Sequence, residues 1–287
     1  KDYALHLVVL IRSLVGLIVL FLFIVPLSGG VKVLYTNRLG LHLLRGFCVV
    51  FANITFFLGL AALPLAEGVA IFFISPLLIT IFSVVFLKEI VGPRRWAAVT
   101  IGLIGVLVIL RPGSATFQTT SLLPLSAAFG YATLHMLTRY IGKTESAASM
   151  SFYIQLTFLV VCLTLGLTIG DGKFSGWNDP SLEFLFRAWS WPNNDHYLIL
   201  ILIGTTSAFG GFFISQAYRI SEAAVVAPFE YIALPIAIFW GVIVFGEFPD
   251  KTTFIGIALI LGSGLYIIWR ETVLKEAETP KIPRYRR

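Results

Sequence analysis

Charged residues are scarce in this sequence of 287 residues. Asp, Glu, Lys and Arg together make up 13% of the chain, whereas hydrophobic residues make up 57%, and the mean hydropathy is +0.90. A soluble globular domain has about 25% charged and 45–50% apolar residues. The composition therefore excludes an ordinary soluble domain and indicates a protein whose surroundings are lipid.

The chemical groups on which most enzymes depend are also few. The two cysteines, Cys48 and Cys162, fall inside apolar runs, so we interpret them as small packing residues and not as a disulfide framework. The four histidines lack the spacing of a metal site, and neither a phosphate-binding loop nor a Gly-x-Ser-x-Gly motif occurs. We therefore predict no metal, no cofactor and no enzymatic activity.

What the sequence does contain is a series of long apolar runs. Each is of a length to cross the hydrocarbon core of a bilayer as a helix, which takes about 20 residues. The chain is thus predicted to be an all-α polytopic membrane protein. The nine predicted spans cover residues 5–26, 41–62, 67–87, 95–111, 120–140, 148–170, 196–218, 223–246 and 252–270.

The basic residues set the predicted orientation. The net charge of +6 comes from Lys and Arg that are spread over the loops and the tail, so binding to nucleic acid is not expected. With the loops assigned alternately to the two sides, fourteen of the 21 basic residues lie on the side of the C-terminus, five on the other, and Arg12 and Arg45 within helices. Positive residues favour the cytoplasmic side, so the C-terminus is predicted to be cytoplasmic.

Two segments of the sequence resemble each other. Residues 63–111 and 218–270 each contain a turn, a helix ending in Glu, a short loop and a glycine-containing helix ending in Arg. The first copy starts on the outside and the second on the inside, so the copies are inverted in the membrane. An inverted repeat is typical of transporters that work by alternating access, although a duplication retained for packing alone is the alternative.

The repeat also predicts the organisation of the chain. We expect a first repeat at 1–115, a second at 116–271 and a basic cytoplasmic tail at 272–287. The second repeat has five spans and the first only four. The predicted fold is therefore a ten-helix 5+5 inverted-repeat bundle with its first helix missing and nine spans present.

The same segments resemble a known family. The stretches SQAYRISEAAVVAPFEY and FLFRAWSWP, the SPLLIT and FLKE of the first repeat, and the FGE of the second are similar to the EamA-type permeases of the drug/metabolite transporter superfamily. The resemblance extends over nearly the whole chain. It implies ten helices in two inverted halves, cytoplasmic termini, and transport of small metabolites such as amino acids, riboflavin or S-adenosylmethionine across the bacterial inner membrane.

One acidic residue, Glu230, lies deep inside an apolar run. A charged side chain at membrane depth costs about 2.5–3.5 kcal/mol on insertion scales, so it needs a partner or a function. The matching position of the first repeat is Ser75 or Phe72, and the carboxyl group therefore breaks the repeat symmetry. Our hypothesis is that Glu230 faces a central cavity and binds a cationic substrate or a proton. The alternative is a structural pairing with a buried arginine or with backbone.

Other polar and aromatic residues in the spans complete the predicted site. In lipid such residues turn toward other helices, where they serve either as packing contacts or as ligands. Both alternatives stay open for each of them. The predicted substrate-binding residues are Glu230, Tyr231, Phe229, Arg12, Ser75, Phe72, Tyr153, Gln155, Tyr131 and His135, and Pro76, Pro228 and Pro235 are the predicted helix breaks.

The two intramembrane arginines are interpreted differently. Arg12 is about eight residues into its span, where it can bind an anionic substrate group or pair with a buried acid. Arg45 is closer to a span end and is interpreted as an interface anchor that reaches toward water. Glu89 and Glu247 end matched helices and are interpreted as turn and interface residues.

These features predict secondary active transport of a small solute, amino-acid-like or otherwise polar or amphipathic, by alternating access. The expected partners are that solute, the lipid bilayer and, if transport is coupled, a proton. The alternative within transport is an uncoupled facilitator or exchanger. The alternatives from other functional classes are a non-transporting membrane scaffold and a lipid-modifying enzyme. The sequence predicts neither the substrate, the direction nor the oligomeric state.

Overall fold

The structure is a computed structural model that describes residues 3–112 and 118–278. All of its regular elements are helices, so the predicted all-α polytopic membrane fold is confirmed. The predicted repeat boundary at 115/116 and the tail beyond residue 278 lie outside the described residues.

The first half of the chain begins with a helix that stays continuous through a short π-helical stretch. The elements are α1 (Leu5–Val19), η1 (Leu20–Ile24), α2 (Val25–Leu27), η2 (Val31–Leu34), α3 (Leu39–Ala62), α4 (Leu65–Phe72), α5 (Ser75–Leu87) and α6 (Pro93–Leu110). The second half contains the longest described helix, α13, and a long loop between α8 and α10. Its elements are η3 (Thr119–Ser121), α7 (Leu122–Ile141), α8 (Ala147–Ile169), α9 (Pro180–Phe186), η4 (Asn194–His196), α10 (Tyr197–Ile220), α11 (Ala223–Val226), η5 (Ala227–Ile232), α12 (Ala233–Phe245) and α13 (Lys251–Glu278).

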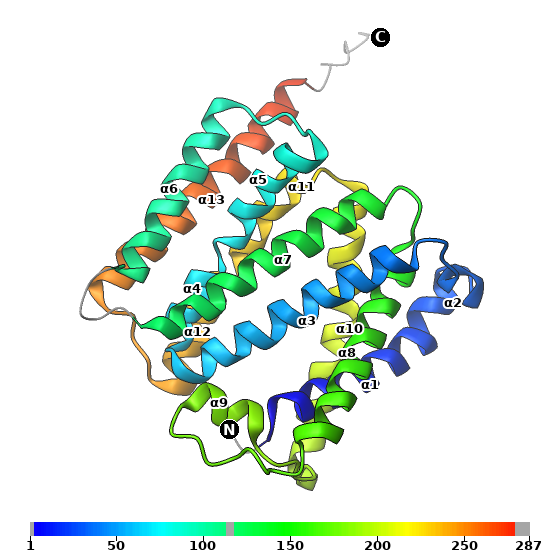
Figure 1. The fold of residues 1–287 in the computed structure, drawn as a ribbon. Helices are drawn as coiled ribbons and strands as arrows, with labels where there is room; N and C mark the ends of the chain where they lie inside the picture. The colour runs from blue at the N-terminus through cyan, green and yellow to red at the C-terminus, as the bar shows by residue number, and fades with distance from the viewer. Residues whose placement is uncertain (1–2, 113–117, 279–287) are drawn as a thin grey trace, which may run out of the picture.

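Eight of the nine predicted spans are long and apolar enough to cross a membrane by themselves. The ninth is α7, which has 20 residues but carries His135, Thr138 and Arg139. It is enclosed by α3, α4, α5 and α10 (Figure 1). Because protein surrounds this helix on several sides, its polar residues meet other helices and need not face lipid.

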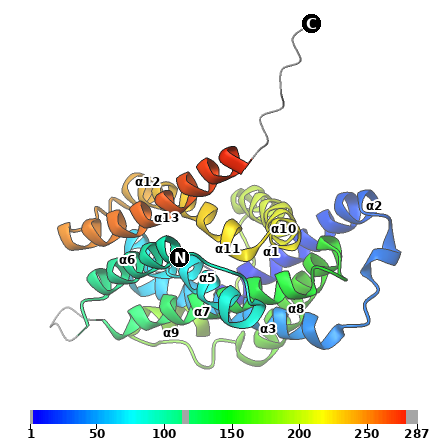
Figure 2. The ribbon, with the colours of Figure 1, turned by 90° about the horizontal axis from the view of Figure 1, so that it is seen from above.

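The helices pack in a few long pairs. α3 lies along α7, α1 packs against both α8 and α10, and α6 lies beside α13, as both views of the ribbon show (Figures 1 and 2). Ser and Thr side chains inside these helices mostly bond the carbonyl one turn earlier, as Thr133 does to Phe129. Such bonds satisfy hydroxyl groups where water is absent.

Glycines bring α6 and α13 into backbone contact. A Cβ atom at Gly105 would lie 2.8 Å from the carbonyl oxygen of Gly256, and one at Gly256 would lie 2.4 Å from Ile109. A Cβ atom at Gly264 would strike the Tyr231 ring. These contacts depend on the absence of a side chain, which is the use that membrane helices make of small residues.

A glutamate at the end of one helix caps the start of another helix at each end of the bundle. Glu247, just after α12, accepts a hydrogen bond from the Leu65 amide at the start of α4, at 2.8 Å. Glu89, just after α5, accepts from the amides of Ala223 and Ala224 at the start of α11, at 3.2 and 3.3 Å. Both bonds satisfy amides that have no partner within their own helix.

The two glutamates reach these positions through the same turn. Lys88 and Gly246 both adopt the left-handed conformation, with φ of 58° and 68°. The following amides, of Glu89 and Glu247, bond the carbonyl six residues earlier, at 3.1 Å in each case. A left-handed residue ends each helix, and it sends the next side chain sideways toward a neighbouring helix.

Two of the spans are broken near their predicted prolines. Residues 73–74 separate α4 from α5, and Pro76 is the second residue of α5. The run from 223 to 245 divides into α11, the 3₁₀ segment η5 that contains Pro228, and α12, in which Pro235 is the third residue. Proline lacks an amide hydrogen and fits the first turn of a helix, which explains why new helical segments begin at these points.

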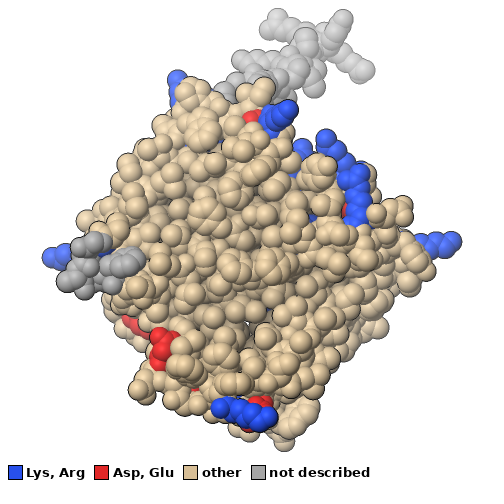
Figure 3. All heavy atoms as spheres, in the orientation of Figure 1, with Lys and Arg blue, Asp and Glu red and all other residues tan. Residues whose placement is uncertain are grey.

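Charged side chains lie around the rim of the molecule and leave its broad face apolar (Figure 3). Cys48 and Cys162 are buried and free, as predicted for packing residues. The short helix α9 in the loop between α8 and α10 packs on the end of α3, where the Ser181 hydroxyl donates to the Leu58 carbonyl at 2.7 Å. The molecule is thus an apolar bundle with polar ends and one polar interior region.

Candidate functional site

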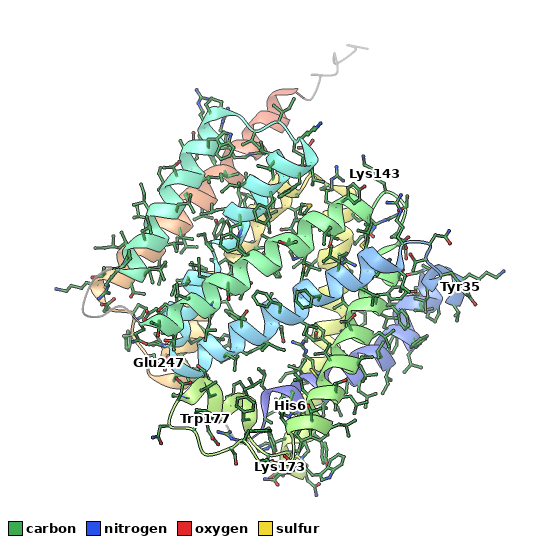
Figure 4. The ribbon with its side chains drawn as sticks, viewed as in Figure 1. His6, Tyr35, Lys143, Lys173, Trp177 and Glu247 are labelled. Atoms are coloured by element: carbon green, nitrogen blue, oxygen red, sulfur yellow. The ribbon has the colours of Figure 1, made fainter. Side chains whose placement is uncertain are left out.

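That interior region is a cavity of about 270 Å³ lined by five helices, α1, α3, α7, α8 and α10. Its wall is formed by residues from the inner parts of these helices, between the ends marked by His6 and Trp177 on one side and by Tyr35 and Lys143 on the other (Figure 4). The lining consists of Arg12, Arg45, Val49, Asn53, Tyr131, Leu134, His135, Thr138, Ser151, Ile154, Gln155, Phe158, Ser207, Ala208, Gly210, Gly211, Ile214 and Ser215.

Small residues on α10 provide the space. Its contribution to the wall includes Ser207, Gly210, Gly211 and Ser215, and a Cβ atom at either glycine would meet no atom within 4 Å. The facing helices contribute the long side chains. The cavity therefore has one smooth wall and an opposite wall that carries the functional groups.

Arg45 is fully buried in this cavity. Its Nε and Nη2 donate to Thr138 Oγ1 at 3.1 and 3.0 Å, and Nη1 donates to the Met150 carbonyl oxygen at 3.5 Å. The interpretation of Arg45 as an interface anchor is therefore wrong. Its position near the end of a span was misleading, because α7 and α8 cover this part of α3 and bury the side chain.

Arg12 lines the same cavity from α1. Its guanidinium carbon lies 4.8 Å from the centroid of the Phe158 ring, and Nη2 donates to Asn53 Oδ1 at 3.5 Å. The Nε atom of Arg12 has no hydrogen-bond partner within the part of the chain that the structure describes. Arg12 thus belongs to the cavity lining, as a polar group on the inner side of α1.

Several other polar atoms of the lining lack a partner among the described residues. They are Ser151 Oγ, Gln155 Oε1 and both ring nitrogens of His135. Buried polar atoms are nearly always hydrogen-bonded in native proteins, so a group of unpaired ones around one cavity indicates that something else binds there. The cavity offers both donors and acceptors to such a guest.

His135 lines the cavity and contacts tyrosines that bond to Glu230. Its ring lies between those of Tyr131 and Tyr218, with centroid distances of 4.2 and 4.1 Å. The Tyr218 hydroxyl donates to Glu230 Oε1 at 2.6 Å, and Tyr131 also interacts with this carboxyl group. Glu230 is not part of the cavity lining and lies behind this aromatic layer.

The predicted site residues thus fall into separate groups. Arg12, Tyr131, His135 and Gln155 line the cavity together. A second group of predicted residues, which includes Glu230, lies around η5 and the break between α4 and α5. This second group contains Tyr231, which is buried, and Phe72, whose ring lies 5.2 Å from that of Tyr131. It also contains Ser75, which is buried and whose hydroxyl has no hydrogen-bond partner among the described residues.

Two predicted residues lie elsewhere. The hydroxyl of Tyr153 donates to the Leu34 carbonyl at 3.1 Å, and its ring packs at a tilt against His42, away from the cavity lining. Phe229 has half of its side chain exposed on the outer surface. Neither residue faces the cavity.

Sequence reasoning missed the small residues on α10 and the hydroxyl groups of Thr138 on α7 and Ser151 on α8. The stretch SAFGGFFIS carries small residues spaced along one helix, and this was the available signal for a cavity wall. Thr138 and Ser151 gave no signal, because hydroxyl groups in membrane helices usually bond their own backbone.

Outside the spans, one ion pair shows a clear electrostatic effect. Arg111, after α6, donates to Asp250, before α13, and Asp250 also accepts from the Thr253 amide at 2.8 Å. The hydrogen bond from Arg111, with that from Thr253, lowers the pKa of Asp250 to about 2. Asp250 therefore caps α13 as a carboxylate at physiological pH.

The chain has relatives of known function. It is 32% identical over 267 residues to a riboflavin transporter of Vibrio cholerae, which covers 92% of this chain and 83% of the relative. It is 29% identical over 242 residues to an S-adenosylmethionine uptake transporter of Rickettsia prowazekii, which covers 84% and 76%. Both relatives are transporters.

A solved crystal structure has the same fold. It superposes with a TM-score of 0.70 at 18% identity and covers 96% of this chain and 91% of that one. The EamA-like transporter family matches residues 3–111 and again residues 118–269. With its helical bundle, its polar interior cavity and these two matches, the chain belongs to the EamA-like transporter family.

Proposed function

We propose that this protein carries a small polar or amphipathic metabolite across the bacterial cytoplasmic membrane by alternating access, with its C-terminus in the cytoplasm. The observation that supports this most strongly is the cavity with its unpaired polar atoms, set inside a bundle whose exterior is apolar. In this mechanism the segments 1–115 and 116–271 act as the two halves that move around the cavity.

The relatives suggest which solutes to test first. Riboflavin and S-adenosylmethionine both combine a flat ring system with polar groups. The cavity offers aromatic surface from Phe158 and Tyr131 and polar groups from Gln155 and Ser151. Such a mixture of apolar walls and a few convergent polar groups is common in small-molecule sites.

We propose Glu230 as the group that couples transport to protons. Its described partners are tyrosines, and no cationic side chain of the described chain lies within ion-pair distance of it. The layer of Tyr218, Tyr131 and His135 joins it to the cavity. Acidic residues at membrane depth are typical of proton relays in transporters.

The test uses the purified full chain in proteoliposomes with radiolabelled riboflavin or S-adenosylmethionine. An imposed pH gradient should drive accumulation by the wild type above the equilibrium level. Glu230→Gln should abolish this accumulation but keep exchange of labelled for unlabelled solute, because the cavity is intact. Glu222→Gln, which removes an exposed carboxyl group near the start of α11, is the matched control and should behave like the wild type.

Two results would contradict these proposals separately. Accumulation by Glu230→Gln equal to that of the wild type would remove the proton-coupling role and favour an uncoupled facilitator. Absence of both accumulation and exchange for a wide panel of metabolites would contradict transport itself and favour a non-transporting scaffold.

A further inference from the structure

Among the described residues, the cavity lining contains two arginines and no acidic side chain. In the described chain, no carboxylate lies within ion-pair distance of Arg12 or Arg45. The carboxyl group of Glu145 is hydrogen-bonded to Thr36 at 2.9 Å and lies 3.2 Å from His42. It attracts the Arg45 charge only from beyond ion-pair distance. The wall therefore has two guanidinium groups whose contacts are a threonine, an asparagine, a carbonyl and an aromatic ring.

Burying two positive charges without an opposite charge lowers the stability of the folded protein. Arginine stays protonated in proteins, and each buried ion carries a penalty of several kcal/mol unless an opposite charge compensates it. Neutral hydrogen bonds from Thr138 and Asn53 recover part of this cost. Two uncompensated positive charges on the wall of one cavity favour an anionic guest.

The donors that are available define the chemistry of that anion. A guanidinium group presents its N–H bonds in a planar fork that fits the two oxygens of a carboxylate or phosphate. Arg12 has a free Nε and a weak contact through Nη2, so it can turn toward a ligand without breaking a strong bond. Thr138 holds the Arg45 guanidinium group in place, so its positive charge has a fixed position in the cavity.

An apolar surface lies next to these charges. Phe158 packs under the Arg12 guanidinium, and Ile154 and Val49 line the same cavity. A guest with an anionic group attached to a flat apolar body would place its charge at the arginines and its body against these side chains.

We infer that Arg12 and Arg45 form an anion-binding subsite that recognises a carboxylate or phosphate group of the transported metabolite. This inference rests on the proposed function, because it assigns the substrate class of the same cavity. Arg45 is the fixed member of the subsite, and Arg12 is the member that closes on the ligand.

The test compares ligands that differ only in charge. Benzoate and benzamide have the same shape, but only benzoate is anionic, and phenyl phosphate tests the second anion type. Binding to the purified full chain in detergent is measured from the rise in Tm with ligand concentration, since a ligand that binds the native state stabilises it. We expect benzoate or phenyl phosphate to raise the Tm at concentrations at which benzamide does not. The better of the two anions identifies the class of group.

Variants assign the effect to the two side chains. Arg12→Gln and Arg45→Gln should each raise the Kd of the preferred anion about tenfold or more, which is the loss of one charged hydrogen bond. Arg38→Gln, an exposed arginine just before α3, should leave the Kd unchanged. If Arg45→Gln does not fold, Arg12→Gln decides, because Arg12 makes only one weak hydrogen bond.

Equal binding of benzoate and benzamide, no binding of any of the three ligands, or unchanged Kd values in Arg12→Gln would overturn the subsite. A failure of the proposed function looks different. In that case the anions bind and the arginine variants lose them, but no metabolite crosses the membrane of proteoliposomes.

Discussion

Two adjacent glycines determine the width of the cavity at the scale of single residues. Gly210 and Gly211 leave the α10 wall without side chains, and no atom lies within 4 Å of a Cβ added to either. In the interior of a helix each glycine costs about 0.8–1 kcal/mol relative to alanine. The helix is therefore less stable than it could be at the place where the cavity needs room.

We predict that Gly211→Leu fills the cavity without disturbing the fold. The added side chain should project into the space that a ligand would occupy, so transport and ligand binding should be lost. The Tm should stay the same or rise slightly, because leucine favours helix more than glycine does. Both quantities are measured on the same purified preparation.

Gly262→Leu is the matched control, because this glycine of α13 also has no atom near a Cβ position but does not line the cavity. It should keep transport. A Gly211→Leu protein that transports at the wild-type rate would show that the solute passes elsewhere.

Some residues of the site could be predicted from sequence and others could not. Arg12, Tyr131, His135 and Gln155 were found because a polar group in an apolar span has to face protein. Arg45 was misjudged because distance from a helix end does not reveal which helices cover it. Glycine is neither polar nor charged, so hydropathy gave no reason to place Gly210 and Gly211 at a site.

At the scale of elements, the most informative contacts are the caps made by Glu89 and Glu247. Their match in the two repeats was visible in the sequence, and so was their place at helix ends. The sequence did not reveal which helices they cap. The spacing of residues in a sequence gives their positions along one helix, but it does not identify the neighbouring helix. Likewise, apolarity predicted one span from 223 to 246 but could not predict the 3₁₀ segment within it.

We predict that Glu89→Ala and Glu247→Ala each lower the free energy of unfolding by about 1–2 kcal/mol, as the loss of a helix cap does. The two effects should add in the double variant, because the residues lie at different ends of the bundle and share no partner. Unfolding in mixed micelles with increasing SDS measures these differences.

Glu222→Ala serves as the comparison here, because its side chain caps no helix amide. It should leave the free energy of unfolding unchanged. A loss in Glu89→Ala no larger than that in Glu222→Ala would show that the cap contributes little to stability.

At the scale of the whole molecule, the distribution of charge relates the bundle to the membrane. Lys143 and Lys173 lie at different ends of the molecule, with an apolar surface between them (Figures 3 and 4). The fold class followed from the sequence, because the length and apolarity of the runs leave few other structures possible in lipid. The arrangement of the helices around a cavity needed the structure.

We predict that Lys173 faces the outside of the cytoplasmic membrane and Lys143 the cytoplasm. In intact cells a membrane-impermeant maleimide should label Lys173→Cys, and it should label Lys143→Cys only after the membrane is permeabilised. The native Cys48 and Cys162 are buried, so the background should be low. Labelling of Lys143→Cys in intact cells would reverse the orientation.

The two glutamate caps also bear on the opening of the bundle. Both caps are formed in this structure. If the bundle opens alternately to the two sides of the membrane, each opening would break one of these caps. Glu89 accepts from two amides and lies 3.6 Å from Arg139, whereas Glu247 accepts from one amide, so breaking the two caps costs different amounts of free energy. This difference would set how often the bundle opens to each side, but it would not set the direction of net transport. The net direction of flow would then depend on the concentrations and gradients that the cell maintains across its membrane.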